Sequence, residues 1–375
     1  MKKNQLDIGI VTSPFLLKAG VPPVSNLIDI LSFFSSDLYL ISGSDGIALS
    51  NKDHIHICLI EHEQEKNIYS KVMKFLVSNL KISYRLTKLS NVDLWFFFIG
   101  ERVLSIPMLI AKLLGKNVIF VSSGSLNKFA TYNKNILDII MIYVVDPINY
   151  VLSDKITISS DRLISKKNLL KHKNKIFICS EHFVDPDKFK TTVQFNERGT
   201  LIGYIGRLDV VKGILNLIEA MPDVVTKTDN IHFLVGGDGP LRGEIKEYFH
   251  RYDLNDSAEY IGWISHDNLP KYLNNLKLIV IPSYSETGPQ IMFEAMSCGT
   301  PVLVTPVGLA PDVIKDSETG FIMENNSPEC IARNIIRALK HPDLEKISMN
   351  ARNLAEKEFT YEAAVERYKG LFENI

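Results

Sequence analysis

Two cations lie close together where an apolar strand pattern gives way to a helical one. Arg207 follows a strand that we expect to end at Gly206, which would permit a tight turn, and Lys212 stands where the next helix is expected to begin. Positive side chains at a helix N-terminus oppose the helix dipole, so two of them there call for an anionic partner. A diphosphate that bridges both cations and the loop amides would be such a partner. Two solvated surface charges explain the same pattern.

Two carboxylates stand eight residues apart around a second junction of the same kind. A buried strand at 278–282 leads to Glu286, a helix is expected to start near Pro289, and Glu294 lies inside that helix. Residues 288–291 would present unpaired N–H groups at the helix start. Carboxylates placed in this way suit hydrogen bonds to hydroxyl groups, as in ribose recognition. Structural ion pairs or simple exposure are the alternative interpretations.

Two further motifs favour structural interpretations. Residues 236–240 read as a glycine-rich turn before a helix that begins at Pro240, with Asp238 as its capping residue. Asp185-Pro186-Asp187 has the spacing of a metal-binding DxD motif, but its context favours a structural turn. The sequence offers no other pattern typical of a metal site.

Short apolar runs alternate with helical patterns along the whole chain, which predicts parallel sheets covered by helices. In the first half, strands are expected at 7–13, 37–43, 54–60, 93–100, 117–123, 155–159 and 175–180, with helices near 22–35, 65–82, 103–114, 133–152 and 161–168. In the second half, strands are expected at 200–206, 232–236, 259–262, 278–282 and 301–305, with helices near 212–226, 240–251, 267–275, 289–298, 327–340 and 345–373. This order indicates an α/β protein of two doubly wound, Rossmann-like domains.

The length of 375 residues suits two domains, and the polar, aperiodic segment 190–199 is the best linker between them. We therefore expect domains at 1–192 and 193–375, with the last helix packing back on the first domain. Residues 1–190 carry 24 lysines and arginines against 17 acidic residues, whereas the remainder carries 18 against 26. A basic half favours an anionic partner, either a membrane surface or nucleic acid. Four scattered cysteines and no apolar leader favour a cytoplasmic protein.

With these motifs the chain resembles a family-4, retaining glycosyltransferase of the GT-B fold. The hallmark of that family, two glutamates in E-x7-E, is matched by Glu286 and Glu294. Its G-R-x4-K-G motif is matched at 206–213, its G-x-G-P at 237–240, and its V-D-P-x-x-F at 184–189. The resemblance is specific over residues 200–325 and implies two domains that face an interdomain cleft.

The resemblance implies a role for each matched residue. Arg207 and Lys212 would bind the donor diphosphate, and Glu286, with them the implied catalytic set, would contact the donor sugar. Glu294 would hold the ribose hydroxyls, and the backbone near Ile264 would receive the base. The other implied donor-binding residues are Gly20, Gly206, Gly288, Pro289, Gln290 and Ile291. The family uses a nucleotide-sugar co-substrate, here most simply a UDP- or GDP-sugar, with neither a metal ion nor a further cofactor.

The resemblance thus implies transfer of a hexose-type sugar, with retention, to a glycan, glycolipid or lipid-linked acceptor in polysaccharide or glycoconjugate biosynthesis. Departures include Ser122-Ser123-Gly124, where family members often carry a histidine on the acceptor side. Two other hypotheses are a nucleotide-sugar isomerase or hydrolase and a non-catalytic sugar-nucleotide-binding subunit. Because the basic residues lack interleaved aromatics, we do not expect nucleic-acid binding. An anionic membrane surface remains the possible partner of the basic domain, which would make the protein peripheral on the cytoplasmic membrane face.

Overall fold

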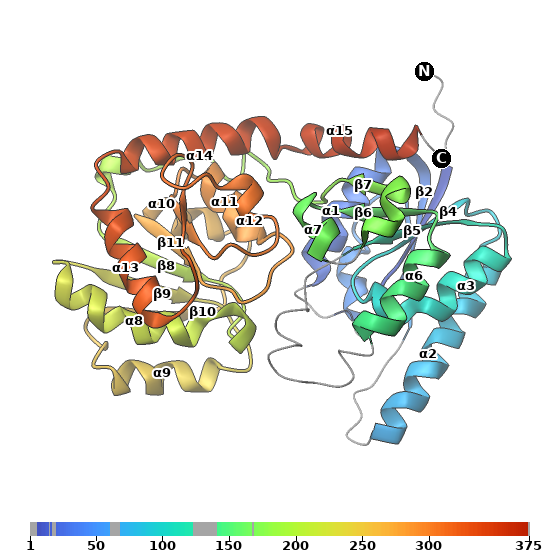
Figure 1. Cartoon of the computed structure of the whole chain (residues 1–375), viewed down its shortest axis with the longest axis horizontal. Coiled ribbons are helices and arrows are strands. Elements are labelled where there is room, and N and C mark those ends of the chain that lie inside the picture. The colour runs from blue at the N-terminus through green and yellow to red at the C-terminus, as the bar shows by residue number, and fades with distance from the viewer. Residues whose placement is uncertain are drawn as a thin grey trace. The chain divides into compact units, whose positions relative to one another are not determined.

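The computed structural model describes residues 6–14, 16, 20–60, 68–122, 141–166 and 169–373. The chain divides into two compact units, one formed by Met1–Glu181 with Ala364–Ile375 and the other by His182–Ala363 (Figure 1). This division falls before the boundary expected at 192–193. The reason is that Val184 and Phe189 are buried in the core of the second unit.

The first unit alternates strands and helices as the apolar runs predict. Its elements are β1 (Leu6–Val11), α1 (Val21–Ser32), β2 (Ser35–Ser42), β3 (Ile55–Leu59), α2 (Ile68–Lys88), β4 (Leu94–Phe97), α3 (Ser105–Leu113), β5 (Asn117–Val121), α6 (Asp146–Leu152), β6 (Lys155–Ile158), α7 (Arg162–Lys166) and β7 (Ile176–Ile178). Short 3₁₀ segments lie at Ser44–Leu49, Glu101–Leu104 and Leu169–Lys175, and a π-helical turn at Met141–Val145 precedes α6.

The second unit repeats the scheme. Its elements are β8 (Leu201–Ile205), α8 (Ile214–Lys227), β9 (His232–Gly236), α9 (Arg242–Arg251), β10 (Ala258–Gly262), α10 (Leu269–Asn275), β11 (Leu278–Ile281), α11 (Gln290–Ser297), β12 (Val302–Val304), α12 (Ala310–Val313), β13 (Phe321–Ile322), α13 (Pro328–Leu339), α14 (Leu344–Glu358) and α15 (Tyr361–Phe372). The division between the units falls within α15, whose residues from Ala364 onward count with the first unit.

All strands in both sheets are parallel, and in each sheet the strand order reverses at an inner strand. The first has the order β3-β2-β1-β4-β5-β6-β7 and the second the order β10-β9-β8-β11-β12-β13. In the second sheet the chain first builds outward from β8 and then returns to place β11 on the other side of β8. Loops after two such strands diverge, which leaves a crevice at the carboxyl ends where ligands of these sheets bind. The loops after β8 and β11 are those that carry the predicted cations and carboxylates.

The second sheet is buried on both faces. One core cluster packs α8, α9 and α13 against it and includes Ile218, Phe249 and Ile331. The other packs α10, α11 and α14 on the opposite face, with Leu273, Phe293 and Ala351. Figure 1 shows the two helix layers on either side of this sheet. The strands read as continuous apolar runs because neither face meets water.

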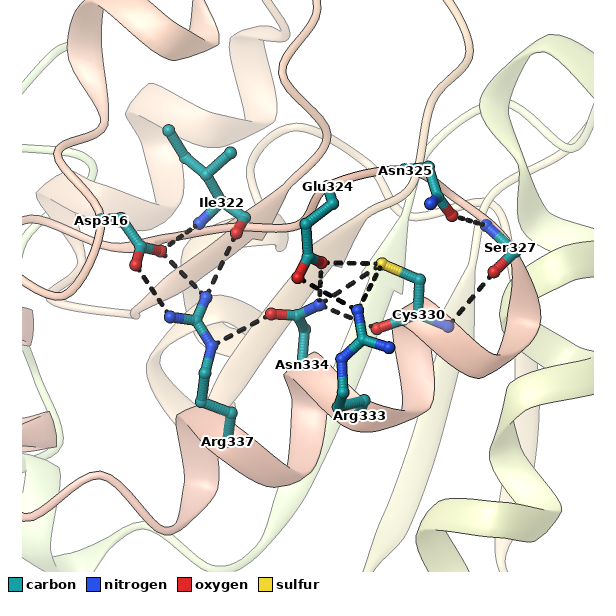
Figure 2. Close-up of polar contacts among 9 residues, drawn as sticks. All are labelled: Asp316, Ile322, Glu324, Asn325, Ser327, Cys330, Arg333, Asn334 and Arg337. Atoms are coloured by element: carbon teal, nitrogen blue, oxygen red, sulfur yellow. Dashed lines mark hydrogen bonds and ion pairs between the residues drawn. The ribbon is translucent and has the colours of Figure 1, made fainter.

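A polar network holds the short edge strand β13 to α13 (Figure 2). The Arg337 guanidinium donates to both carboxylate oxygens of Asp316, at 2.8 and 2.9 Å, and Asp316 also accepts the Ile322 amide. Nearer the N-terminal end of α13, the Cys330 thiol and the Asn334 amide donate to Glu324, at 3.0 and 2.8 Å. A strand of two residues has few ladder bonds of its own, so these side chains fix its position.

Several helix predictions need correction. The helix expected at 345–373 is two helices, because the chain breaks at Phe359 and the Thr360 hydroxyl accepts the Ala363 amide at the start of α15. The helix expected to begin at Pro240 begins at Arg242. Strand β13 and helix α12 were not predicted. Of the described helices, none is long and apolar enough to span a bilayer.

Candidate functional site

The loop after β8 carries both predicted cations. Lys212 closes a 3₁₀ turn at Val210–Lys212, not the first turn of α8 as expected, and the Asp209 carboxylate caps that turn by accepting the Lys212 amide at 3.0 Å. Gly213 follows with φ +70°, and a Cβ there would lie 2.1 Å from the Pro282 carbonyl oxygen. The glycine therefore lets the β8 loop pack directly on the start of the β11 loop.

Lys212 and Glu286 form an ion pair between the two loops. The Lys212 ammonium lies 2.6 Å from Glu286 Oε1, which also accepts the Ser283 hydroxyl at 2.8 Å. Only 10% of the Glu286 side chain is exposed. The dipole argument expected an anion beside Lys212, and in this chain Glu286 fills that position. A half-buried carboxylate and ammonium in contact can together offer an acceptor and a cation to a sugar phosphate.

Arg207 is also paired, with its neighbour Asp209, and 42% of its side chain is exposed. Below it, the Tyr204 hydroxyl donates to the Arg207 carbonyl at 2.8 Å. Burial raises the pKa of Tyr204 well above its ordinary value, and Asp209 and Glu286 act in the same direction. The phenol therefore stays neutral and supports the backbone from which Arg207 projects.

Backbone contacts fix the loop that carries Glu286. Gly308 has φ +57°, and a Cβ there would meet the carbonyl oxygens of Glu286 and Thr287 at 2.4 Å each. The Leu309 amide donates to the Thr287 carbonyl at 2.7 Å. On the other side, a Cβ on Gly288 would lie 2.9 Å from the buried His182 ring. The loop is thus held between Gly308 on one side and the His182 ring on the other.

Helix α11 starts from this loop and carries the second carboxylate. Pro289 is its N-cap residue, Gln290 donates to the Phe183 carbonyl at 2.8 Å, and Ile291 packs partly buried on the core. Glu294 lies one turn into the helix with 4% of its side chain exposed, and its Oε1 is 2.9 Å from His266 Nε2. The structure thus gives the two predicted carboxylates different partners.

The remaining predicted residues lie apart from these pairs. The Gly206 amide donates to the Gly236 carbonyl at 3.1 Å, and Gly206 lacks the positive φ of a tight glycine turn. Ile264 lies over Gly236 in the loop after β10. Gly20 belongs to the first unit, where it is the N-cap residue of α1. Positions 123 and 124, where the sequence departs from the family, lie outside the described residues.

The glycine-rich turn after β9 is structural, but Asp238 does not cap a helix. Its carboxylate accepts the Gly239 amide at 2.9 Å and lies 3.8 Å from Arg242, while α9 has Leu241 at its N-cap without a side-chain bond. Asp185 likewise binds its own turn, since its carboxylate accepts the amides of Asp187 and Lys188. Across the described residues, no three His, Cys, Asp or Glu side chains are grouped to hold a metal ion.

A shallow depression of about 470 Å³ lies at the other edge of the second sheet, lined by residues such as Thr200, His232 and Asn255. These residues stand at the amino ends of β8–β10 and include none of the charged pairs described above. Because parallel sheets bind ligands at the carboxyl ends of their strands, we place the candidate site at the β8 and β11 loops.

Residues 185–354, which hold both loops, match the family model described as glycosyl transferases group 1. Over this segment, the chain is similar to the group 1 glycosyl transferases. Solved structures agree on the fold of the whole chain. The structure of Anabaena HepE in complex with UDP-glucose has a TM-score of 0.79 at 15% identity, covering 99% of this chain and 100% of HepE.

Curated relatives match this chain over part of its length. It is 26% identical to an alpha-D-kanosaminyltransferase of Streptomyces kanamyceticus, over 53% of either chain. It is 30% identical to the capsular polysaccharide biosynthesis glycosyltransferase CapM of Staphylococcus aureus, over 46% of this chain and 45% of that one. The matched segments thus span about half the length of these curated relatives.

Sequence reasoning missed four partners of the predicted residues. Asp209 stands two residues from Arg207, so its sign and spacing were a usable signal. Ser283 stands three residues from Glu286, but a serine in a loop is too common to single out. His266 and Gly308 are distant in sequence from Glu294 and Glu286, and only the fold brings them together.

Proposed function

We propose that this protein is a group 1 glycosyl transferase that moves a hexose-type sugar from a UDP- or GDP-linked donor to a glycan, glycolipid or lipid-linked acceptor. Retention at the anomeric carbon and independence of divalent metal are part of the proposal. The observation that carries it is the Lys212–Glu286 pair at the switch point of the second sheet, with Arg207 on the same loop. Relatives named for sugar transfer and for capsular polysaccharide biosynthesis support it.

In this proposal the two cations act on the leaving group. As the bond between the sugar and the diphosphate breaks, negative charge develops on the diphosphate, and fixed cations stabilise it without reorganising. Lys212 would exchange part of its contact with Glu286 for a phosphate oxygen, and Arg207 would exchange Asp209 in the same way. Glu286, released from one cation, would accept hydrogen bonds from the donor sugar.

Thermal-shift assays with UDP, GDP and ADP test donor binding. A nucleotide at 100 times its Kd stabilises the folded state by about 2.7 kcal/mol, which for a unit of this size is a rise in Tm of roughly 5–10 °C. We expect UDP or GDP to produce this rise, and Arg207→Ala and Lys212→Ala to remove most of it. Lys227→Ala is the matched control, because it breaks an exposed ion pair with Asp223 on the same unit.

Turnover assays test the sugar contact separately. Glu286→Gln keeps an oxygen for the Ser283 hydroxyl, so we expect the nucleotide to bind as before while donor turnover falls about 100-fold or more. Wild-type protein whose Tm responds to none of the nucleotides, or site variants that respond like Lys227→Ala, would contradict the proposed function.

We propose further that the first unit docks on an anionic membrane from the cytoplasmic side. Helix α2 exposes four apolar side chains at the spacing i, i+3, i+7 and i+11, namely Met73, Leu76, Leu80 and Tyr84. Helix α3 packs beside α2, and α6 beside α3 (Figure 1). Both add exposed apolar side chains, among them Leu113 and Val151. We call this set of exposed residues on α2, α3 and α6 the apolar stripe.

Helix α6 supports this interpretation because its polarity is inverted. Its Asp146 and Asn149 are buried, and the Asn149 side-chain oxygen accepts the Ser105 hydroxyl at 2.6 Å, while Ile148 and Val151 are exposed. Exposed valine and isoleucine side chains are unfavourable in water and favourable against lipid.

Cations lie beside the stripe. Lys81, Arg85 and Lys88 are exposed on α2. The basic run at 171–175 contributes less than its composition suggests, because the Lys175 ammonium donates to carbonyls at the end of α6, at 2.8 Å to that of Ser153. Burial, with Lys175 and Lys171, lowers the pKa of His172. Each well-placed cation near an anionic membrane contributes about 1 kcal/mol.

A further inference from the structure

The Glu294 carboxylate is held by a side chain that no motif contains. With 4% of its side chain exposed, Glu294 needs hydrogen-bond donors to remain charged in its position on α11. His266, in the loop between β10 and α10, supplies one through Nε2 at 2.9 Å, although 60% of its own side chain is exposed. An exposed ring that reaches a buried carboxylate is either incidental or held in place for that purpose.

The His266 ring is fixed by two neighbours from one turn. The Lys188 ammonium lies 3.0 Å from His266 Nδ1, and the Phe189 ring lies against the imidazole with centroids 5.1 Å apart. An ammonium can only donate, so Nδ1 is the acceptor and the ring hydrogen is on Nε2. Nε2 therefore donates to Glu294. Lys188 is itself anchored by Asp267 at 2.7 Å.

The turn that carries these neighbours is rigid and is attached to α11. The Asp185 carboxylate accepts the amides of Asp187 and Lys188, at 2.9 and 3.2 Å. Val184 and Phe189 are buried in the same core as α11, and the Ser297 hydroxyl donates to the Phe189 carbonyl at 2.6 Å. The V-D-P-x-x-F motif thus has a structural function, which is to hold Lys188 and Phe189 against the His266 ring.

We propose that His266 is a positioning residue for Glu294, with Lys188 setting its tautomer, and that the pair prepares the carboxylate for the ribose diol of the donor. This inference rests on the proposed function and on the ribose-binding role that the family resemblance implies for Glu294. A carboxylate already oriented by the protein does not have to be ordered when the nucleotide arrives, which strengthens binding to the hydroxyls alone. The consequence is selective: His266 affects the affinity for a ribonucleotide more than that for a 2′-deoxyribonucleotide, which keeps only the 3′-hydroxyl.

Isothermal titration with UDP and GDP and their 2′-deoxy counterparts tests the proposal. We expect His266→Ala to weaken binding of the ribonucleoside diphosphate that binds wild type about 5- to 10-fold, and to weaken binding of the 2′-deoxy compound by a smaller factor. His266→Gln, whose amide N–H can replace Nε2–H, should restore most of the difference. Lys188→Met should weaken ribonucleotide binding by a smaller factor than His266→Ala. The control His250→Ala, which changes an exposed histidine on α9, should not weaken it.

The outcomes separate the two proposals. Wild type that binds no nucleoside diphosphate overturns the proposed function and this inference with it. Wild type that binds, with His266→Ala weakening the ribo and 2′-deoxy compounds equally or not at all, overturns the positioning role alone. The melting temperature of each variant, measured in the same buffer, identifies any general loss of folding, and His266→Gln then provides the second test.

Discussion

At the residue scale, the candidate site depends on glycines that let two loops touch. Gly213 and Gly308 both have positive φ, and at both a side chain would collide with a backbone carbonyl of the β11 loop. Neither glycine bears a functional group, yet each determines where Lys212 or Glu286 lies. The position of the ion pair therefore depends on the absence of a side chain at Gly213 and Gly308.

Gly308→Ala tests this dependence. We expect a loss of about 2 kcal/mol or more in unfolding free energy, because alanine disfavours φ +57° and its Cβ would meet two oxygens at 2.4 Å. Gly243→Ala is the control, since it lies inside α9 in open space and should stabilise the helix by roughly 0.5–1 kcal/mol. Urea denaturation of the three proteins measures both effects. Equal stability of Gly308→Ala and wild type would contradict the argument.

At the element scale, the edge of the second sheet depends on charged side chains. Hydrogen bonds from the Cys330 thiol, from the Glu324 backbone and from the Asn334 amide lower the pKa of Glu324 to about 2, from an ordinary value of 4.5. For Asp316, burial raises the pKa, but hydrogen bonds from Arg337 and the Ile322 amide outweigh it and the net pKa is lowered. Both carboxylates therefore stabilise the fold only while they are ionised.

Glu324→Gln should reveal this contribution as a function of pH. A lowered folded pKa gives stability that is full above about pH 4.5 and is lost as the pH falls toward about 2. We expect the variant to be less stable than wild type at pH 7 by less than about 1 kcal/mol, because 64% of the side chain is exposed. Circular dichroism melts from pH 7 to pH 3 should show the difference shrinking. A difference that grows with acid would be the wrong sign.

Elements with strong periodicity were predictable from sequence. Short elements, and elements that depend on tertiary contacts, were not. The apolar run of β11 and the glycine-proline start of α11 predicted the second loop within a residue or two. The two-residue β13 has no pattern to detect, and it exists because α13 holds it through Arg337. The residue types of the site were likewise predictable, but their partners were not, since the contact between His266 and Glu294 depends on how α10 and α11 pack.

At the scale of the whole molecule, the charge asymmetry and the apolar stripe make the same prediction. Flotation with liposomes containing anionic lipid should recover the wild-type protein, and neutral liposomes should recover much less. Replacing Met73, Leu80 and Val151 with glutamate should reduce recovery at least 10-fold, because it removes apolar burial and adds repulsion. Ile47→Glu and Met349→Glu, exposed apolar positions outside the stripe, are controls. Equal recovery of all proteins on both lipids would contradict membrane docking.

The division of the chain within α15 has a consequence for how the protein is made. Phe372 stacks on Phe34 with centroids 4.1 Å apart, and Leu371 and Tyr368 are fully buried in the first unit. On the ribosome these residues emerge only after the entire second unit. At about 5–20 residues per second, the first unit would wait roughly 10–40 seconds for the segment that completes its core. We expect Phe34 and its neighbours to stay uncovered during that interval, so that the incomplete chain presents aromatic surface that chaperones could bind.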